Sequence, residues 1–361
     1  MQIICVVLIG LLFLAALLYL IYKSSKPGVL KNIRRWINTI TNESKGLIAK
    51  NKIRWCTFDI EINGHKDITH PSILLVDDEM LVAATPYPQL LEDGGVVFEN
   101  PYLFKTFLTT GDAPINFKLV DSYPICLPEE AHYNSDPIMF EWKGKIYLMT
   151  RKQEGPDYLS KIILQEYDNE KWSKPIDIIK TNRMSACPMV IQMGGKINVY
   201  MINYKWNSFK GHKTIGYTTQ NIEIWENESE DLTSFKFKSF IEWPHVQQVY
   251  HGDMFFYDGC YYMLFNGLNT SFRTFYGIPD HFKYLWLAKS KDGVHFLVSK
   301  RPLLKRSGIY KPTSYIKDGI LNVYFATDNS YFGKARKQYR SGNRIGQFSI
   351  PLNSIQYETI L

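Results

Sequence analysis

One order of polar and apolar positions occurs five times after residue 65 of the chain. In each copy a polar residue, usually followed by proline, opens an apolar strand, and a tight turn leads into a second strand rich in tyrosine and aliphatic residues. The five apolar strands begin near His70, Ser135, Ala186, His251 and Tyr310. The five turns are at Asp77-Asp78, Lys143-Gly144, Gly194-Gly195, Asp258-Gly259 and Asp318-Gly319. Because Asp-Gly between alternating apolar residues is a strong hairpin signal, the pattern predicts five hairpins.

The spacing between the copies, roughly 50–65 residues, leaves room for a sheet of four strands in each copy. Further alternating stretches lie between the hairpins, for example at residues 161–167 and 285–290. Residues 52–62 also alternate and are expected to pair with the last copy and close a ring. We therefore expect an all-β fold, a five-bladed β-propeller over residues 51–361, with a β-sandwich as the alternative.

The N-terminal segment is apolar enough to cross a bilayer. Residues 3–22 contain no charge, and about 20 residues of helix match the hydrocarbon core. The basic residues follow this segment: Lys23, Lys26, Lys31, Arg34 and Arg35. This order favours an uncleaved anchor over a signal peptide and places the basic flank in the cytoplasm. We expect one transmembrane helix at residues 1–24, with the lipid bilayer as partner through 3–22, a basic juxtamembrane linker at 25–50 and a cytoplasmic propeller.

Composition narrows the classes of function. The 361 residues carry a net charge of +7 and 15% aromatic residues, as expected for a globular chain with aromatic-rich strands. Neither a basic helix nor a zinc-finger pattern is present, which argues against nucleic-acid binding. The five cysteines show no C-x-x-C pair and are expected to be free. No metal-ligand motif, phosphate loop or dinucleotide motif is present, so we expect no metal and no cofactor.

Propeller geometry predicts which polar residues meet. If all five inner strands begin at the same end of the axis, the side chains that open them converge there, and the second strands return to that end. The strand openings supply His70, Asp136, Cys187, His251, Asp253 and Lys311. The returning ends supply Tyr87, Arg151, Tyr204, Asn266 and Asp328, and the third strand of the first blade opens with Glu99 and Asn100. The aromatic residues expected around them are Tyr87, Trp142, Tyr204, Trp206, Tyr276 and Tyr310.

Carboxylates, imidazoles, cations and aromatic rings in one place are typical of a sugar-binding site. Cleavage of a glycosidic bond needs one carboxylic acid that protonates the leaving oxygen and a second carboxylate that acts as base or nucleophile. Asp136 and Asp253 lie on non-adjacent blades and are the first candidate pair, with Glu99 as the third candidate. Their expected separation across the axis is about 6.5–9.5 Å, the range of inverting enzymes. His70 or His251 could instead act as acid or base, or tune a carboxylate.

The repeat resembles the five-bladed propellers of glycoside hydrolase families 43, 62, 32 and 68, in a divergent branch. The shared features are blade openings such as Asp136-Pro137, a following turn and a tyrosine-rich strand, over roughly residues 65–330. In family 43 the first blade opens with an aspartate base, the second carries an aspartate that tunes a pKa, and the third carries a glutamate acid. Asp136 matches the second position, whereas His70 stands at the first and Cys187 at the third.

The resemblance implies a glycoside hydrolase-like enzyme with an oligo- or polysaccharide substrate. Because two of the three catalytic positions differ, either the acid–base pair has moved or hydrolysis has been lost. The substrate-binding residues we expect are His70, Tyr87, Asn100, Arg151, Tyr204, His251, Asn266, Lys311 and Asp328. We expect a membrane-anchored, glycan-active enzyme. The alternatives are a non-catalytic glycan-binding propeller, and glycosyl transfer or phosphorolysis in which the basic side chains hold an anion.

Overall fold

The structure is a computed structural model of the chain, and it divides into two units, Met1–Lys45 and Gly46–Leu361. In the second unit it describes residues 46–60, 67–86, 100–108, 112–121, 124–125, 133–154, 159–181, 184–209, 212–242, 247–269, 284–306, 308–327 and 344–358. The predicted anchor at 3–22 lies outside these residues. Within the described part, no helix is long and apolar enough to cross a bilayer.

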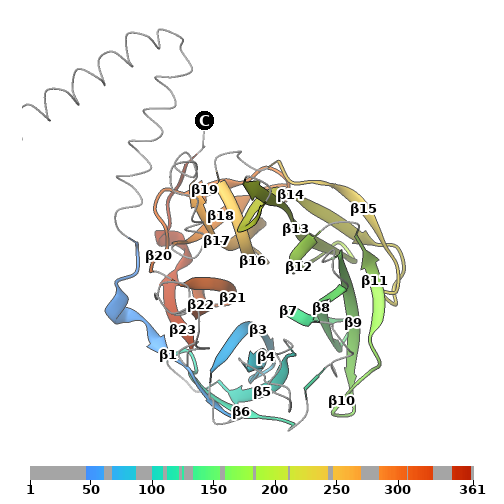
Figure 1. Cartoon of the computed structure of the whole chain (residues 1–361). Coiled ribbons are helices and arrows are strands. Elements are labelled where there is room, and N and C mark those ends of the chain that lie inside the picture. The colour runs from blue at the N-terminus through green and yellow to red at the C-terminus, as the bar shows by residue number, and fades with distance from the viewer. Residues whose placement is uncertain are drawn as a thin grey trace, which may run out of the picture. The chain divides into compact units, whose positions relative to one another are not determined.

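Five sheets stand around one axis, as Figure 1 shows. The innermost strands, which define blades I to V, are β3 (Ile68–Val76), β7 (Tyr133–Trp142), β12 (Met184–Met193), β16 (Gln247–Tyr257) and β21 (Ile309–Lys317). The second strands are β4 (Glu79–Pro86), β8 (Lys145–Glu154), β13 (Lys196–Phe209), β17 (Cys260–Asn269) and β22 (Ile320–Thr327). The third strands are β5 (Tyr102–Phe107), β9 (Leu159–Asp168), β14 (His212–Asn227), β18 (Tyr284–Ser290) and β23 (Arg344–Pro351). Each innermost strand contacts those of both neighbouring blades, so the predicted five-bladed propeller is confirmed.

Shorter elements complete the outer parts of the blades. They are η1 (Lys50–Lys52), β6 (Asn116–Leu119), β10 (Lys171–Trp172), β11 (Ile176–Lys180), β15 (Phe235–Phe240), β19 (Leu297–Ser299), β20 (Leu304–Lys305) and η4 (Leu352–Ser354). The hairpin turns follow the predicted chemistry. Asp258 and Gly259, between β16 and β17, have φ of 47° and 66°. A two-residue turn with both central φ positive matches the right-handed twist of its strands, which is why Asp-Gly is favoured there.

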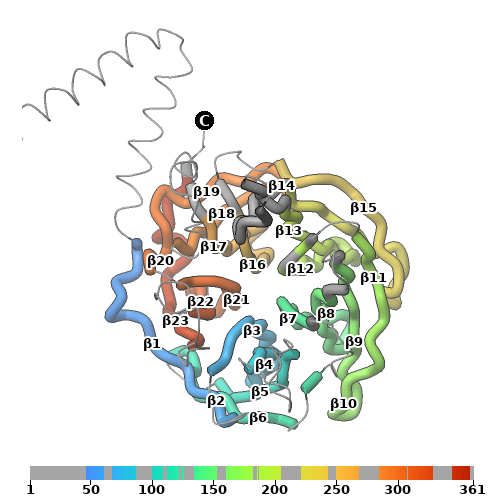
Figure 2. The backbone as a smooth tube through the Cα atoms, viewed as in Figure 1, coloured from blue at the N-terminus to red at the C-terminus, as the bar shows by residue number. Residues whose placement is uncertain are grey.

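The ring is closed by chain from both ends of the propeller unit. β1 (Arg54–Trp55) pairs antiparallel with β23 in blade V, beside which the N-terminal blue segment runs in Figure 2. β2 (Thr57–Asp59) then pairs parallel with β6 of blade I, so one short segment joins the first and last blades. β24 (Tyr357–Glu358) returns to β19 of blade IV. The predicted closure by this N-terminal segment is therefore confirmed through residues 54–59.

The hydrophobic core is divided among the junctions between neighbouring blades. Successive side chains of a strand point to opposite faces of its sheet, and both faces of each blade are covered. Thus Met80 and Val82 of β4 pack against Tyr324 of blade V, whereas Leu81 of the same strand packs against Met139 of blade II. Because both faces are buried, the second strands read as nearly continuous apolar runs instead of strict alternations.

The inner strands share one irregularity, a β-bulge near the end where they begin. The ladder register shifts between Thr69 and Ser72 in blade I, and at the corresponding place in the other four blades. In four blades the residue at the bulge has positive φ, and proline follows it: His70 (47°), Asp136 (54°), Cys187 (53°) and Lys311 (41°). Such a conformation costs of order 1–3 kcal/mol for a residue other than glycine and is concentrated at functional sites. Proline suits the next position because the interrupted ladder needs no donor there.

Five side chains link the inner strands to one another around the axis. In three of these links a side-chain oxygen accepts a hydrogen bond from a backbone N–H of the next blade. Ser72 accepts from Met139 at 2.8 Å, Asp253 from Ser314 at 2.7 Å and Thr313 from Ile73 at 3.2 Å. Asp136 accepts from the N–H of Cys187, and the thiol of Cys187 contacts the N–H of Gly252. Together these five links join every blade to the next, so several axis residues also hold the ring together.

Candidate functional site

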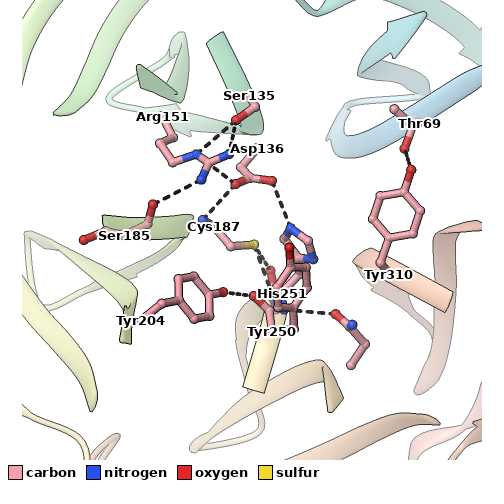
Figure 3. A network of polar contacts seen from close by, with 12 residues as sticks. Thr69, Ser135, Asp136, Arg151, Ser185, Cys187, Tyr204, Tyr250, His251 and Tyr310 are labelled. Carbon is pink, nitrogen blue, oxygen red and sulfur yellow. Dashed lines mark hydrogen bonds and ion pairs between the residues drawn. The ribbon is translucent and has the colours of Figure 1, made fainter. Parts of the chain in front are cut away.

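The bulges bring side chains from different blades to the axis, and Figure 3 shows the polar contacts that join Asp136 there to Arg151, Cys187 and His251. The exposed fractions of Asp136 and Cys187 are 0%, that of Lys311 is 1%, and those of His251 and His70 are 5% and 7%. These residues are the openings of the inner strands that the sequence singles out. Burying so many polar groups costs free energy unless they are paired, so their partners define what the site can do.

Asp136 is the centre of this network. Its Oδ2 lies 3.3 Å from Nε of Arg151 and accepts a hydrogen bond of 3.2 Å from the backbone N–H of Cys187. Its Oδ1 lies 3.3 Å from Nε2 of His251, which comes from blade IV on the other side of the axis. Burial alone would raise the pKa of Asp136, but Arg151 and His251 outweigh it and hold that pKa well below its ordinary range. Asp136 is therefore a permanent anion at neutral pH.

Arg151 is held rigidly beside that carboxylate. Its Nε and Nη2 donate to Oγ of Ser135 at 3.0 and 2.6 Å, and its Nη1 donates to the carbonyl of Ser185 at 3.4 Å. Arg151 stands on β8 directly opposite Ser135, whereas Ser185 belongs to blade III. The planar guanidinium thus joins two blades and fixes the orientation of Asp136. Ser135 precedes the bulge and was not among the residues that sequence reasoning selected.

Two imidazoles and a phenol share the opposite side of Asp136. The ring centroids of His70 and His251 are 5.9 Å apart, and Tyr310 lies 5.3 Å from His70 and 5.9 Å from His251. The hydroxyl of Tyr310 bonds to Thr69. Burial lowers the pKa of His251 to about 4, against the opposing effect of Asp136, so His251 is neutral at pH 7. A neutral imidazole beside a carboxylate has a lone pair with which to accept a proton or bind a cation.

Tyr204 and Tyr250 line the network on the side of blades III and IV. The hydroxyl of Tyr204 donates to the carbonyl of Tyr250, their rings lie 5.6 Å apart, and Tyr250 meets His251 edge to face at 4.3 Å. Burial raises the pKa of Tyr204 well above its ordinary value, so it stays a neutral donor. Sequence reasoning selected Tyr204 and missed Tyr250. Tyr250 lies at the bulge of blade IV. The sequence shows no sign of this bulge, because no proline follows Tyr250.

Asp253 has a different environment from the one expected. Its Oδ2 accepts from the N–H of Ser314 at 2.7 Å and from its Oγ at 3.0 Å, on blade V. It is His251, not Asp253, that reaches Asp136 across the axis. Burial raises the pKa of Asp253 to about 6, against the opposing effects of Lys311 and Ser314. The environments of the two aspartates therefore push their pKa values in opposite directions, which is the usual mark of an acid and a base.

Cys187 stands at the blade III position for which the resemblance to family 43 implies a glutamate acid. Its Sγ donates to the carbonyl of Gly252 at 2.9 Å, and burial raises its pKa to about 11. A thiol in this state is neither a proton donor matched to a leaving oxygen nor a reactive thiolate. Cys56, Cys187 and Cys260 are free, as expected. Cys187 therefore holds blades III and IV together and does not replace the glutamate.

Two of the predicted binding residues have structural partners, Asn266 a backbone N–H and Asn100 a neighbouring side chain. Oδ1 of Asn266 accepts from the N–H of His251 at 3.0 Å, and Oδ1 of Asn100 accepts from Nδ2 of Asn134 at 2.9 Å. Trp142 was expected beside the site, and this is wrong. It pairs with Lys145 next to the turn, at the far end of β7, where its Nε1 donates to the carbonyl of Glu230. Glu99, Tyr87, Asp328, Tyr276 and the side chain of Trp206 lie outside the described residues.

Three of the axis residues could also hold a metal ion, which spacing in the sequence did not suggest. One ligand atom from each of His70, Asp136 and His251 lies within 4.8 Å of the other two. The residues come from blades I, II and IV, so no short motif contains them. Two imidazoles and a carboxylate form a donor set that binds first-row transition metals.

The sequence matches no protein-family model and no curated protein. Solved structures do match its fold. A glycoside hydrolase family 43 enzyme from Xanthomonas citri, in complex with xylose, is 11% identical, with a TM-score of 0.55 over 81% of this chain and 90% of that one. A β-xylosidase is 10% identical, with a TM-score of 0.56 over 85% and 98%. An α-L-arabinanase from Penicillium chrysogenum, in complex with arabinobiose, is 10% identical, with a TM-score of 0.51 over 80% and 95%. This chain therefore shares the five-bladed propeller fold of family 43 xylosidases and arabinanases.

Proposed function

We propose that the chain is a glycan-active enzyme of the glycosidase type, which acts at the axis where the inner strands begin. The observation that carries the proposal is the set of bulges that aim His70, Asp136, His251 and Lys311 at one place. In four of the five blades the residue at the bulge has positive φ, which costs backbone free energy. The neighbours in fold that contain xylose and arabinobiose support a carbohydrate as the ligand.

Asp136 and Asp253 are the described carboxylates that we propose for the chemistry, with Glu99 as a third candidate. Asp136 remains ionised beside Arg151, and Asp253, with its pKa raised to about 6, is the group able to carry a proton near neutral pH. Glycosidic cleavage uses one carboxyl group in each state. Nε2 of His251 lies 3.3 Å from Oδ1 of Asp136, on the other side of the axis, and we propose His251 as the alternative base.

A second candidate function is a propeller that binds glycans without cleaving them. It is favoured by the hydrogen bonds that occupy the two aspartates: Oδ2 of Asp136 is bound by Arg151 and Cys187, and Oδ2 of Asp253 by Ser314. In this reading, recognition rests on Tyr204, Tyr250 and Tyr310, whose rings surround the network. A phosphate-dependent reaction is the remaining alternative. Its support is Lys311, a cation that is 1% exposed at the axis and could bind a phosphate.

The test is digestion of a panel of oligo- and polysaccharides, with and without inorganic phosphate, by the full chain and by Asp136→Asn and Asp253→Asn. Asp177→Asn is the matched control, because Asp177 is an aspartate in ion pairs with Lys161 and Lys180 on the outer part of blade II. Loss of turnover in the two axis variants, with the control unchanged and all variants folded by circular dichroism, supports the proposal. Absence of turnover on every glycan, or equal turnover in all variants, contradicts it, and turnover only with phosphate indicates phosphorolysis.

We also propose that residues 3–22 anchor the propeller to a membrane, with the propeller on the cytoplasmic side. The support is the uncharged apolar stretch and the basic residues that follow it. Sedimentation with membranes after alkaline washing, and protease protection of the propeller in sealed vesicles, test the two parts separately. A chain that is released by the alkaline wash contradicts the anchor. A propeller that protease cleaves only from the outer side of the membrane contradicts the cytoplasmic orientation.

A further inference from the structure

We propose that His70, Asp136 and His251 form a binding site for a first-row transition-metal dication such as Zn²⁺, at the axis of the propeller. One ligand atom of each residue lies within 4.8 Å of the other two, and their exposed fractions are 7, 0 and 5%. The three ligands come from three blades, so folding of the ring creates the site. The proposal goes beyond the glycan activity and does not depend on it.

The two oxygens of Asp136 have different surroundings. Oδ2 is bound by Nε of Arg151 and by the N–H of Cys187. Oδ1 is fully buried, and its polar neighbour across the axis is Nε2 of His251 at 3.3 Å. A carboxylate oxygen that faces an imidazole nitrogen in this way is placed to share a metal ion with it.

The distance between Oδ1 of Asp136 and Nε2 of His251 suits a shared metal ion. It is 3.3 Å, and two atoms bound to one tetrahedral metal at about 2.0 Å are separated by about 3.3 Å. Nδ1 of His251 has no hydrogen-bond partner within the described residues, so this nitrogen does not fix the tautomer of the ring. The ring of His70 completes the triangle, with its centroid 5.9 Å from that of His251.

The surroundings match what metal ligands need. Ligating carboxylates are themselves held by hydrogen bonds from an outer shell. Here Arg151 holds Oδ2 of Asp136 and is fixed in turn by Ser135 and Ser185. The N–H of His251 is held by Asn266. Thus partners hold Asp136 through Oδ2 and His251 through its backbone N–H, on atoms other than the two that face each other.

The donor set selects among metals. Imidazole nitrogens suit zinc and its neighbours, whereas Ca²⁺ requires six to eight oxygen ligands, which this site does not offer. Three protein ligands leave a fourth position for water, as in catalytic zinc sites. The nearby positive charges of Arg151 and Lys311 favour a hydroxide or another anionic oxygen at that position. If the proposed function holds, this water lies beside the position where family 43 carries its base.

The experiment uses the full chain in detergent, stripped with a chelator and then titrated with Zn²⁺ alone or Ca²⁺ alone. Bound metal per chain is measured by mass spectrometry after gel filtration, and stability by thermal unfolding. The variants are His70→Gln and His251→Gln, with His295→Gln as the control. His295 is an exposed histidine 2.7 Å from Asp292 and 3.1 Å from Glu242, so it would reveal adventitious binding at the surface.

We expect one Zn²⁺ per chain and a rise in unfolding temperature for the unmodified chain and for His295→Gln, with no response to Ca²⁺. His70→Gln and His251→Gln should weaken binding by at least the about 10–100-fold that loss of an outer-shell partner costs. Absence of zinc binding, binding lost only in His295→Gln, or equal stabilisation by Ca²⁺ overturns the proposal.

A second measurement does not depend on whether the variants fold. X-ray absorption of the zinc-loaded, unmodified chain distinguishes imidazole ligands from oxygen ligands by the outer-shell scattering of the rings. Two imidazoles in the fit support the site at His70 and His251. A shell of oxygen atoms alone overturns it, and so does a shell containing sulfur, because Cys187 is not among the three ligands.

Discussion

The raised pKa of Asp253 makes a quantitative prediction about stability. Its folded-state value is about 6 and its ordinary value is 3.8, so the folded protein holds a proton on Asp253 at pH values where the unfolded chain has lost it. The contribution of Asp253 to the free energy of unfolding is therefore fully present below pH 3.8, and it is lost as the pH rises through the folded-state pKa of about 6. A shift of about 2 pKa units corresponds to about 3 kcal/mol, of which roughly two thirds is lost between about pH 4.5 and 7.5.

The perturbation is Asp253→Asn, which has the same shape, cannot ionise, and keeps an oxygen to accept from Ser314. Urea unfolding followed by circular dichroism at a series of pH values gives the free energy of unfolding of both proteins. The difference between variant and unmodified chain should move by about 2 kcal/mol in favour of the variant between about pH 4.5 and 7.5. Parallel curves over this range would refute the reasoning, because they would mean that Asp253 titrates alike in both states.

Three further predictions concern other parts of the ring. Arg151→Met leaves Asp136 buried without its cation and should cost about 3–5 kcal/mol in urea unfolding, whereas an unchanged midpoint would mean that solvent reaches the carboxylate. Gly346→Ala places a Cβ 2.6 Å from the ring of Phe325 where β1 closes the propeller, so it should lower stability by about 1–3 kcal/mol, measured the same way. The thiol of Cys187 should not react with a disulfide reagent at pH 8 until urea unfolds the chain, and rapid labelling of the folded protein would contradict its burial.

The fold was predictable because its signals are local. A turn such as Asp258-Gly259 fixes a hairpin by itself, and the pairing partner lies next to it in the chain. The axis was predictable only in part. The order of the strands indicates that His70 and His251 begin inner strands, but it does not indicate toward which neighbour each side chain turns.

The side-chain partners at the site depend on that missing direction. The pairing of Asp253 with Asp136 rests on blade number and stays a prediction, and the carboxylate of Asp253 is bound by Ser314 of the neighbouring blade. In the other four blades the bulges set such directions, because a positive φ rotates the side chain relative to a regular strand. Proline after Asp136 gives a hint of its bulge, and the bulge at Tyr250 in blade IV has no such mark.

The path by which the chain enters the propeller has a mechanical consequence. Tension applied ahead of Gly46 meets the hydrogen bonds of Leu47 to Pro302 and of Ile48 to Leu303 on blade IV before it reaches β1 on blade V. We expect these hydrogen bonds to break one after another, before any force reaches the long inner hairpins. A pull on the chain ahead of Gly46 would thus break contacts at the rim in small steps, and the polar network at the axis would keep its geometry until β1 detached.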